Sequence, residues 1–206
     1  MLIDFGSRTV QTKLCLYGPA MSGKTTALKG LYAHLNGSAP LVSIETSHSK
    51  NSRTLFYDLG TLELKFGIWK LKLNFWTATG QDFYCATRTT VLQGADGLIF
   101  VADSQKLLLD ENIKSWNELK SFFGDKLEHV IPVIVCLNKR DLNNLISVEF
   151  LKEYLQLNSS THIYETIATE NHNLYPAFKE LLENIFQIHK AAKTSIMNQL
   201  KKYPKK

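Results

Sequence analysis

The stretch that most constrains this fold is Gly18-Pro19-Ala20-Met21-Ser22-Gly23-Lys24-Thr25, which has the pattern G-x-x-x-x-G-K-T. Its glycines let the backbone curl until the N–H groups face inward and form an anion site. The lysine then meets the β- and γ-phosphates, and the threonine hydroxyl meets Mg²⁺. An apolar run precedes the stretch and helical periodicity follows it, in the strand, loop and helix order that the motif requires. This predicts a nucleoside triphosphate site, over the alternative of an ordinary glycine-containing turn. We expect nucleotide contacts from Gly18, Pro19, Ala20, Met21, Ser22, Gly23, Lys24, Thr25 and Thr26.

Apolar runs that alternate with helical patterns predict an α/β fold. The almost continuously apolar runs, typical of parallel strands covered on both faces, are 13–17, 97–102 and 130–137. The helical patterns lie at about 24–35, 105–123 and 147–157, with a last helix from near Pro176. This alternation favours right-handed βαβ units and a doubly wound sheet with helices on both faces. Residues 62–66 and 68–76 alternate around Gly67 instead, which predicts a half-exposed hairpin.

Length and composition indicate one globular domain. The 206 residues are 44% hydrophobic, and no apolar run approaches the roughly 20 residues that span a bilayer. Residues 1–5 lack the features of a signal peptide, so we expect a cytoplasmic protein. The three cysteines form no C-x-x-C pair, which suits a reducing compartment, and we expect Cys15 and Cys136 to be buried. Four terminal lysines supply most of the net charge of +5, which argues against nucleic-acid binding by the globular part.

A second motif, Asn138-Lys139-Arg140-Asp141, directly follows the apolar run 130–137 and reads N-K-x-D. A carboxylate at Asp141 can accept from both N1–H and N2–H of guanine, whereas adenine presents an acceptor at N1. Lys139 can lay its stem along the base, and Asn138 can tie this loop to the phosphate loop. A lone tetrapeptide of this kind is usually solvated loop. About 115 residues after a phosphate-binding loop, it predicts a guanine site.

With both motifs in this order, the chain resembles a Ras-superfamily small GTPase, in particular the prokaryotic MglA (gliding-protein) branch. The resemblance rests on Tyr17-Gly18-Pro19, Gly23-Lys24-Thr25-Thr26, Arg53-Thr54-Leu55-Phe56, Thr79-Gly80-Gln81-Asp82-Phe83-Tyr84, residues 97–105 and Leu137 to Leu142. It covers residues 1–190 as the GTPase domain and leaves 191–206 as a helix extension with a basic tail. It implies a P-loop NTPase fold with a mostly parallel six-stranded sheet and Mg²⁺-dependent hydrolysis of GTP to GDP. It also implies a slow molecular switch with effectors that read the bound nucleotide and a roadblock-domain partner that stimulates hydrolysis.

The resemblance assigns the catalytic roles. Gly80 would sense the γ-phosphate, and Gln81 would orient the attacking water. Thr54 would close over Mg²⁺ and the γ-phosphate, so the metal ligands would be Thr25 and Thr54, with Thr46 as the competing switch threonine. Arg53 resembles an arginine that swings into the site, although a solvated surface arginine is an equal interpretation.

Four positions depart from the pattern. Thr77 stands where most Ras-like proteins place the aspartate that holds the metal through water, a substitution that the MglA branch shares. Ala20 replaces a glycine, and its methyl group points toward the space that Gln81 and Arg53 need, which predicts slow hydrolysis. Residues 165–169 resemble the E-T-S-A-K loop, in which Ala168 offers its N–H to the guanine oxygen, but Ile167 and Thr169 differ from it.

Two other functions stay open from the sequence. The rival to a hydrolysing switch is a scaffold that holds GTP or GDP with little hydrolysis, and Ala20 and Thr77 suggest it. An ATP-using transport or kinase enzyme is disfavoured by Asp141. The histidines show no paired metal-ligand spacing. Without a prenylation cysteine, the lysines of 201–206 predict at most weak membrane contact.

Overall fold

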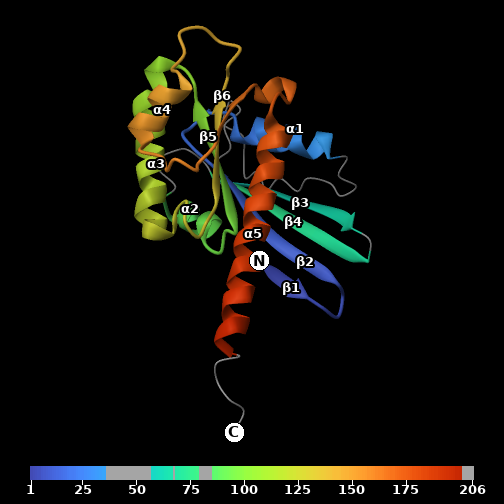
Figure 1. Cartoon of the computed structure of the whole chain (residues 1–206). Helices are drawn as coiled ribbons and strands as arrows, with labels where there is room; N and C mark the ends of the chain where they lie inside the picture. The colour runs from blue at the N-terminus through green and yellow to red at the C-terminus, as the bar shows by residue number, and fades with distance from the viewer. Residues whose placement is uncertain (36–56, 67, 79–84, 201–206) are drawn as a thin grey trace.

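A sheet with helices on both faces organises the chain in the computed structural model, which describes residues 1–35, 57–66, 68–78 and 85–200 (Figure 1). The strands are β1 (Leu2–Asp4), β2 (Thr9–Tyr17), β3 (Tyr57–Phe66), β4 (Trp69–Ala78), β5 (Gly97–Asp103), β6 (Val133–Asn138) and β7 (Ile163–Thr166). The α-helices are α1 (Lys24–His34), α2 (Cys85–Leu92), α3 (Leu109–Phe123), α4 (Val148–Leu155) and α5 (Leu174–Leu200). Short 3₁₀ turns are η2 (Lys106–Leu108), η3 (Gly124–Lys126) and η4 (Ala168–Glu170).

The sheet has the strand order β3-β4-β2-β5-β6-β7, which confirms the predicted doubly wound arrangement. β2 pairs in parallel with β4 and β5, and β5, β6 and β7 continue in parallel. β3 and β4 form the predicted antiparallel hairpin. In β4, Leu71, Leu73 and Phe75 are buried while the residues between them are half-exposed. The alternation of apolar and polar residues in the sequence therefore corresponds to one buried and one half-exposed face of this strand.

The predicted count of six strands is wrong, because the described residues form seven. The additional strand, β1, pairs antiparallel with the start of β2, with Leu2 opposite Gln11 and Asp4 opposite Thr9. All three residues of β1 are exposed. A strand this short, with no buried side chain, leaves no periodic pattern in a sequence.

Two predicted boundaries also need correction. The apolar run 130–137 begins its strand only at Val133, since the N–H groups of Val130 and Ile131 both donate to Lys126 O at 2.9 Å in a turn. The helix expected over 105–123 opens with the 3₁₀ turn η2, and α3 follows. α5 runs without interruption across residue 190.

Helices cover both faces of the sheet (Figure 1), and each face has its own core. On the face covered by α1 and α5, Phe75 packs on Phe178 with ring centroids 5.8 Å apart. On the face covered by α2, α3 and α4, Phe100 packs on Trp116 at 5.1 Å. Because β4, β2, β5, β6 and β7 are parallel, their carboxyl ends lie at the same edge of the sheet. Ligands of such sheets bind at that edge.

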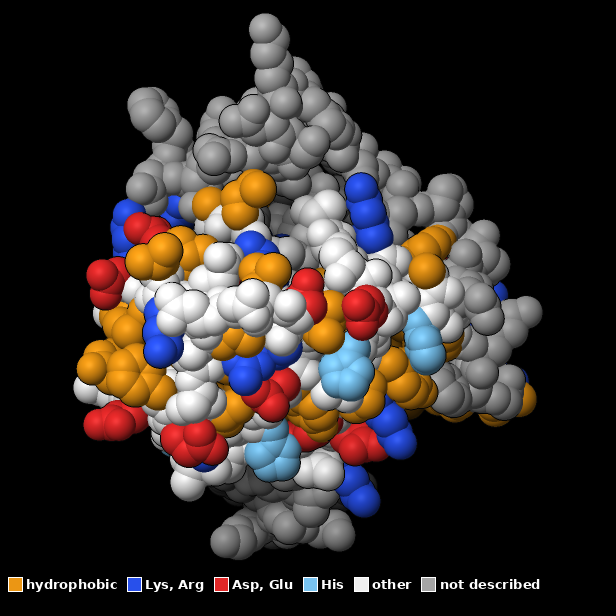
Figure 2. Space-filling model, turned by 90° about the horizontal axis from the view of Figure 1, so that it is seen from above, with side chains coloured by type: hydrophobic (Ala, Val, Ile, Leu, Met, Phe, Trp, Pro, Cys, Tyr) orange, Lys and Arg blue, Asp and Glu red, His pale blue; other side chains and the backbone are white. Residues whose placement is uncertain are grey.

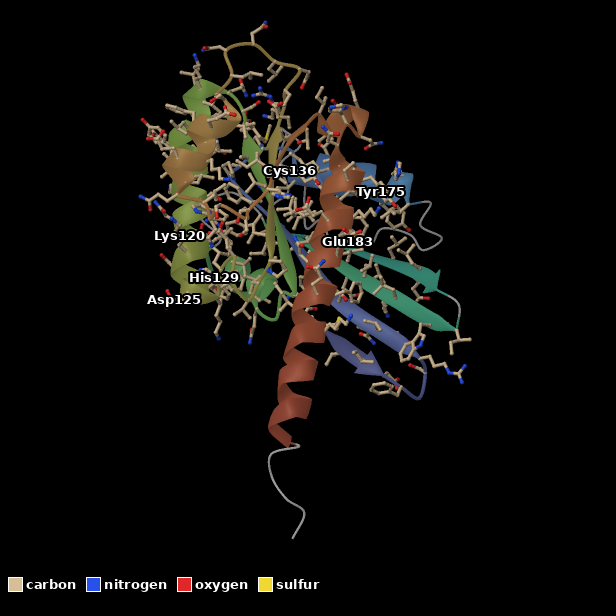
Figure 3. All side chains as sticks on the ribbon, in the orientation of Figure 1. Lys120, Asp125, His129, Cys136, Tyr175 and Glu183 are labelled. Carbon is tan, nitrogen blue, oxygen red and sulfur yellow. The ribbon has the colours of Figure 1, made fainter. Side chains whose placement is uncertain are left out.

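Cys15 and Cys136 lie in these cores as predicted. Cys15 faces the α3 side, whereas Cys136 lies in β6 at the centre of the molecule and faces α5 (Figure 3). Burial raises the pKa of both thiols to about 12. These thiols are therefore protonated and unreactive at neutral pH.

Candidate functional site

The backbone of residues 18–25, the phosphate loop, has a shape that depends on its two glycines. Gly18, Met21 and Gly23 all have positive φ angles of 144°, 63° and 103°. A Cβ on Gly18 would lie 2.2 Å from Val101 O, and one on Gly23 would lie 2.3 Å from Asn138 Nδ2. Neither position accepts a side chain, because neighbouring parts of the sheet edge fill the space. The loop is therefore a cradle packed against β5 and β6.

Lys24 is held inside this cradle. It is 7% exposed, and its Nζ donates to Gly18 O at 2.9 Å and to Pro19 O at 2.6 Å. α1 starts at Lys24 with no acidic residue in its first turn and no side-chain cap. Its first N–H groups and its positive dipole end are thus directed at the loop, as a phosphate site requires. The Ser22 hydroxyl, also buried, has no hydrogen-bond partner among the described residues.

Asn138, at the end of β6, joins the phosphate loop to the loops on the other side of the site. It is 2% exposed, and its Nδ2 donates to Ser22 O at 2.8 Å. Its Oδ1 accepts from Ala168 N at 2.9 Å and from Thr166 Oγ1 at 3.2 Å. The predicted tie between Asn138 and the phosphate loop is present. We call residues 138–141 and 165–169 the base-side loops.

Lys139 adopts a left-handed conformation, with φ of 67°. Its Nζ forms an ion pair with Asp103 Oδ2 at 2.6 Å, and Asp103 is fully buried. Gln105 also donates to Asp103 Oδ1, through its backbone N at 3.0 Å and its Nε2 at 3.1 Å. Sequence reasoning missed Asp103 as a site residue. The sequence feature that could have identified it is a carboxylate at the end of an apolar strand, at the edge of the sheet where ligands bind.

Arg140 is partly buried and makes contacts with other loops, whereas the neighbouring Asp141 is exposed. Arg140 donates to Ile146 O at 2.8 Å and pairs with Glu165 Oε1 at 2.5 Å, so it fastens the two base-side loops together. Asp141 is exposed, and no hydrogen bond from another described residue engages its carboxylate. It is therefore available to a base. Figure 2 looks down on the end of the molecule where the loop after β6 lies, and shows basic and acidic side chains mixed with apolar ones there.

Residues 1–185 match the ADP-ribosylation factor (Arf) family. The chain belongs to this family. It is 31% identical to the mutual gliding-motility protein MglA of Myxococcus xanthus, with 97% of both chains covered. It is 32% identical to the Ras-related protein RABA1b of Arabidopsis thaliana, over 74% of this chain and 71% of that one. With RABA1h of the same plant it shares 30% identity over 69% of this chain and 64% of that one.

The predicted resemblance to Ras-type small GTPases is thereby confirmed. This small GTPase is a GTP-binding, GTP-hydrolysing molecular switch with the P-loop NTPase fold. Its family binds GTP and GDP, generally with Mg²⁺, and works with regulators and effectors. Nothing found favours the alternative of a non-hydrolysing scaffold. Among the described helices, none is both long and apolar enough to cross a membrane.

The structure brings together only part of the predicted site. The phosphate loop, the base-side loops and Ala168 converge through Asn138. The other predicted residues, namely Thr46, Arg53, Thr54, Gly80 and Gln81, lie outside the described residues. Ala168 donates its N–H to Asn138 here, so its donation to a guanine oxygen stays a prediction.

Proposed function

We propose that this chain hydrolyses GTP with Gln81 orienting the attacking water, while Thr54 closes over the γ-phosphate. Arg53 adds positive charge when a stimulating partner engages. The observation that carries the proposal is the buried ammonium of Lys24, held in a backbone cradle that Asn138 joins to Asp141's loop. This arrangement supports a phosphate chain at one end and a base at the other. Positioning and charge stabilisation are what phosphoryl transfer requires.

Lys24 supplies the main described charge for the phosphates. Its ammonium stays within the loop through two carbonyl contacts, and a γ-phosphate oxygen can replace one of them. Charge-assisted hydrogen bonds of this kind are about twice as strong as neutral ones. The uncapped N-terminus of α1 adds further N–H donors.

The residues present fit Mg²⁺ of the kind that binds mainly through phosphates and water. Thr25 follows Lys24 in the first turn of α1 and is half-buried. Groups of three or more His, Cys, Asp and Glu side chains that could hold a metal are absent from the described part of the chain. Mg²⁺ commonly takes only one or two protein ligands at such sites. Thr25 and Thr54 would hold it, and when bound it would neutralise charge on the phosphates.

The proposed intrinsic rate is slow, about 10⁻⁴ to 10⁻² s⁻¹. Thr77 is 1% exposed at the end of β4, where it pairs with Leu16 of β2. A buried hydroxyl offers less negative charge than the aspartate usual there, so support for the metal is weaker. Ala20, half-buried in the phosphate loop, adds a methyl group in the space that Gln81 and Arg53 need.

A single-turnover phosphate-release assay with GTP and Mg²⁺ tests the proposal. Gln81→Leu should slow release at least tenfold without weakening GTP binding, because only water positioning is lost. Lys179→Ala, an exposed change on α5, serves as control. No phosphate release by the wild-type chain would favour a nucleotide-binding scaffold. An unchanged rate in Gln81→Leu would place catalysis elsewhere.

We further propose a roadblock-type or other activating partner. Arg53→Ala should leave the intrinsic rate nearly unchanged and lower the stimulated rate by about 10³ or more, as expected for an arginine finger. Pulldown with GTP-locked and GDP-locked protein would identify the partner. An arginine supplied by the partner would instead leave Arg53→Ala fully stimulated.

We also propose a cytoplasmic location with at most weak membrane contact through the lysines of residues 201–206. Each lysine near an anionic surface contributes about 1 kcal/mol, which gives salt-sensitive binding only. Co-sedimentation with anionic vesicles, with and without these six residues, tests this. Binding that persists at high salt would require another membrane determinant.

A further inference from the structure

Three side chains from separate elements meet behind the phosphate loop: Tyr17 at the end of β2, Arg88 in α2 and Glu118 in α3. Arg88 Nη1 forms an ion pair with Glu118 Oε2. Tyr17 is 2% exposed and directly precedes Gly18. Its buried hydroxyl lies beside both charged groups without standard hydrogen-bond geometry to either. We call these residues the Tyr17–Arg88–Glu118 cluster.

The Arg88 side of the cluster is shielded from water, whereas Glu118 is partly exposed. The Arg88 side chain is 9% exposed and that of Glu118 is 34% exposed. Burial and the Glu118 carboxylate raise the pKa of Tyr17, so its hydroxyl stays neutral beside the two ions. Loss of either ion would leave the other charge uncompensated, so the pair strongly resists separation.

Two members of the cluster sit on a firmly held frame. Tyr17 belongs to the central strand β2, which pairs with β1, β4 and β5. α3 is fastened to β5, because Asn112 accepts from Asp103 N at 2.9 Å and donates to Asp103 O at 2.8 Å. α3 is also tied to α4, since Lys120 donates to Leu155 O at 3.0 Å (Figure 3). The frame that receives Arg88 is therefore fixed on both sides.

Arg88, in the middle of α2, joins this helix to the frame through its ion pair with Glu118. The end of the helix is held by Val91 and Leu92, both buried in the core. A small cleft of about 20 Å³, room for one water molecule, opens beside the cluster. Its lining residues are Gly18, Pro19, Arg88, Glu111, Lys114, Ser115 and Glu118. The cluster therefore borders the backbone of the phosphate loop itself.

We infer that the Tyr17–Arg88–Glu118 cluster fixes α2 against the phosphate loop and thereby sets the rate of GTP hydrolysis. This rests on the proposed function, in which Gln81 orients water. Gln81 lies four residues before α2 in the sequence, so the position of the helix start limits where the glutamine can reach. Arg88 is thus a positioning residue, and displacement of a reacting group by about 1 Å can cost 10²-fold in rate.

Single-turnover hydrolysis and hydrogen exchange of the α2 amides test the inference on the full chain. In Arg88→Met we expect hydrolysis to fall about 10- to 100-fold and α2 exchange to rise at least about tenfold, with GTP affinity within about threefold of wild type. Tyr17→Phe should shift both readouts less, and Arg88→Lys should restore most of the rate. Glu118→Gln should behave like Arg88→Met.

A second tyrosine–glutamate pair supplies matched controls far along the sheet. Tyr164 of β7 donates to Glu180 Oε2 of α5 at 2.5 Å. Tyr164→Phe and Glu180→Gln should lower stability without changing hydrolysis or α2 exchange. An equal loss of hydrolysis in these controls would indicate general destabilisation and overturn the inference.

Each remaining outcome decides the inference. Folded Arg88→Met with wild-type hydrolysis and wild-type α2 exchange would overturn it. If Arg88→Met fails to fold, Glu118→Gln decides in its place, because wild-type hydrolysis and wild-type α2 exchange in that variant would overturn the inference. If the wild-type chain releases no phosphate, the proposed function fails, and α2 exchange alone decides whether the cluster fixes the helix.

Discussion

The phosphate loop and the base-side loops are built by different means. The phosphate loop is shaped by its own backbone, with positive φ at Gly18, Met21 and Gly23 and a lysine bound to the loop's carbonyls. The base-side loops are held by side chains from several elements, chiefly Asn138 and Arg140. A backbone site tolerates side-chain changes outside its few fixed positions, whereas a side-chain network depends on every member.

The largest expected effect lies on the base side. We predict that GTP is preferred to ATP by at least about 10⁴, because adenine leaves the Asp141 carboxylate without its donors. Asp141→Asn should remove most of that preference, measured by calorimetry with Mg²⁺. Asp125→Asn, an exposed acid at the opposite end of the molecule, is the control (Figure 3). Equal affinities of the wild-type chain for the two nucleotides would exclude a guanine site.

In the phosphate loop, Lys24→Ala should weaken GTP binding by at least about 10³, since buried phosphate charges lose their cation. The fold should survive, because the bonds from Lys24 to Gly18 O and Pro19 O lie within its own loop. Binding and circular dichroism measure the two effects, with Lys29→Ala on the exposed face of α1 as control. GTP affinity within a few-fold of wild type would show that residues 18–25 do not hold the phosphates.

Asn138→Ala should damage both regions at once. It leaves Ser22 O and the Ala168 N–H without their partner, so we expect the free energy of unfolding to fall by about 2–4 kcal/mol. GDP affinity should fall in the same variant. Asn184→Ala on α5, half-buried and outside the two loops, is the control for thermal and chemical denaturation. A loss of stability with unchanged GDP affinity would mean that Asn138 serves folding alone.

The smallest effect concerns Asp103, which holds Lys139 at 2.6 Å. Asp103→Asn keeps the shape but weakens the ion pair, so GDP affinity should fall about three- to tenfold. Combining it with Lys139→Met in a double-mutant cycle isolates the pair. Fully additive losses in the cycle would show that Asp103 does not act through Lys139.

The parts of the molecule that could be predicted from the sequence are those determined by residues close together in the chain. The phosphate loop occupies eight consecutive residues, and alternation of apolar runs with helical patterns was enough for the order of the fold. β1 was missed because its three residues are all exposed, and Val130 misled because it is apolar yet 53% exposed in a turn. Apolarity predicts burial only where a partner surface exists.

The missed contacts join residues that are far apart in sequence. Asp103 meets Lys139, and Arg88 meets both Tyr17 and Glu118, only after β2, β5 and α3 have packed. Arg88 and Glu118 carry no motif, and the motifs that contain Lys139 and Tyr17 do not identify their partners. Which aspartate or arginine finds a partner depends on the packed sheet edge, which a pattern of residue types does not encode.

Because Asn138 binds Ser22 O with one end and Ala168 N–H with the other, the two halves of a nucleotide share one protein group. Linkage then requires reciprocity: whatever the bound phosphates do to the affinity for the base, the base does equally to the affinity for the phosphates. The affinities of guanosine and of triphosphate, measured as separate molecules, would therefore underestimate the affinity of the whole nucleotide. We therefore expect that a partner displacing either loop weakens the binding of both ends of GDP.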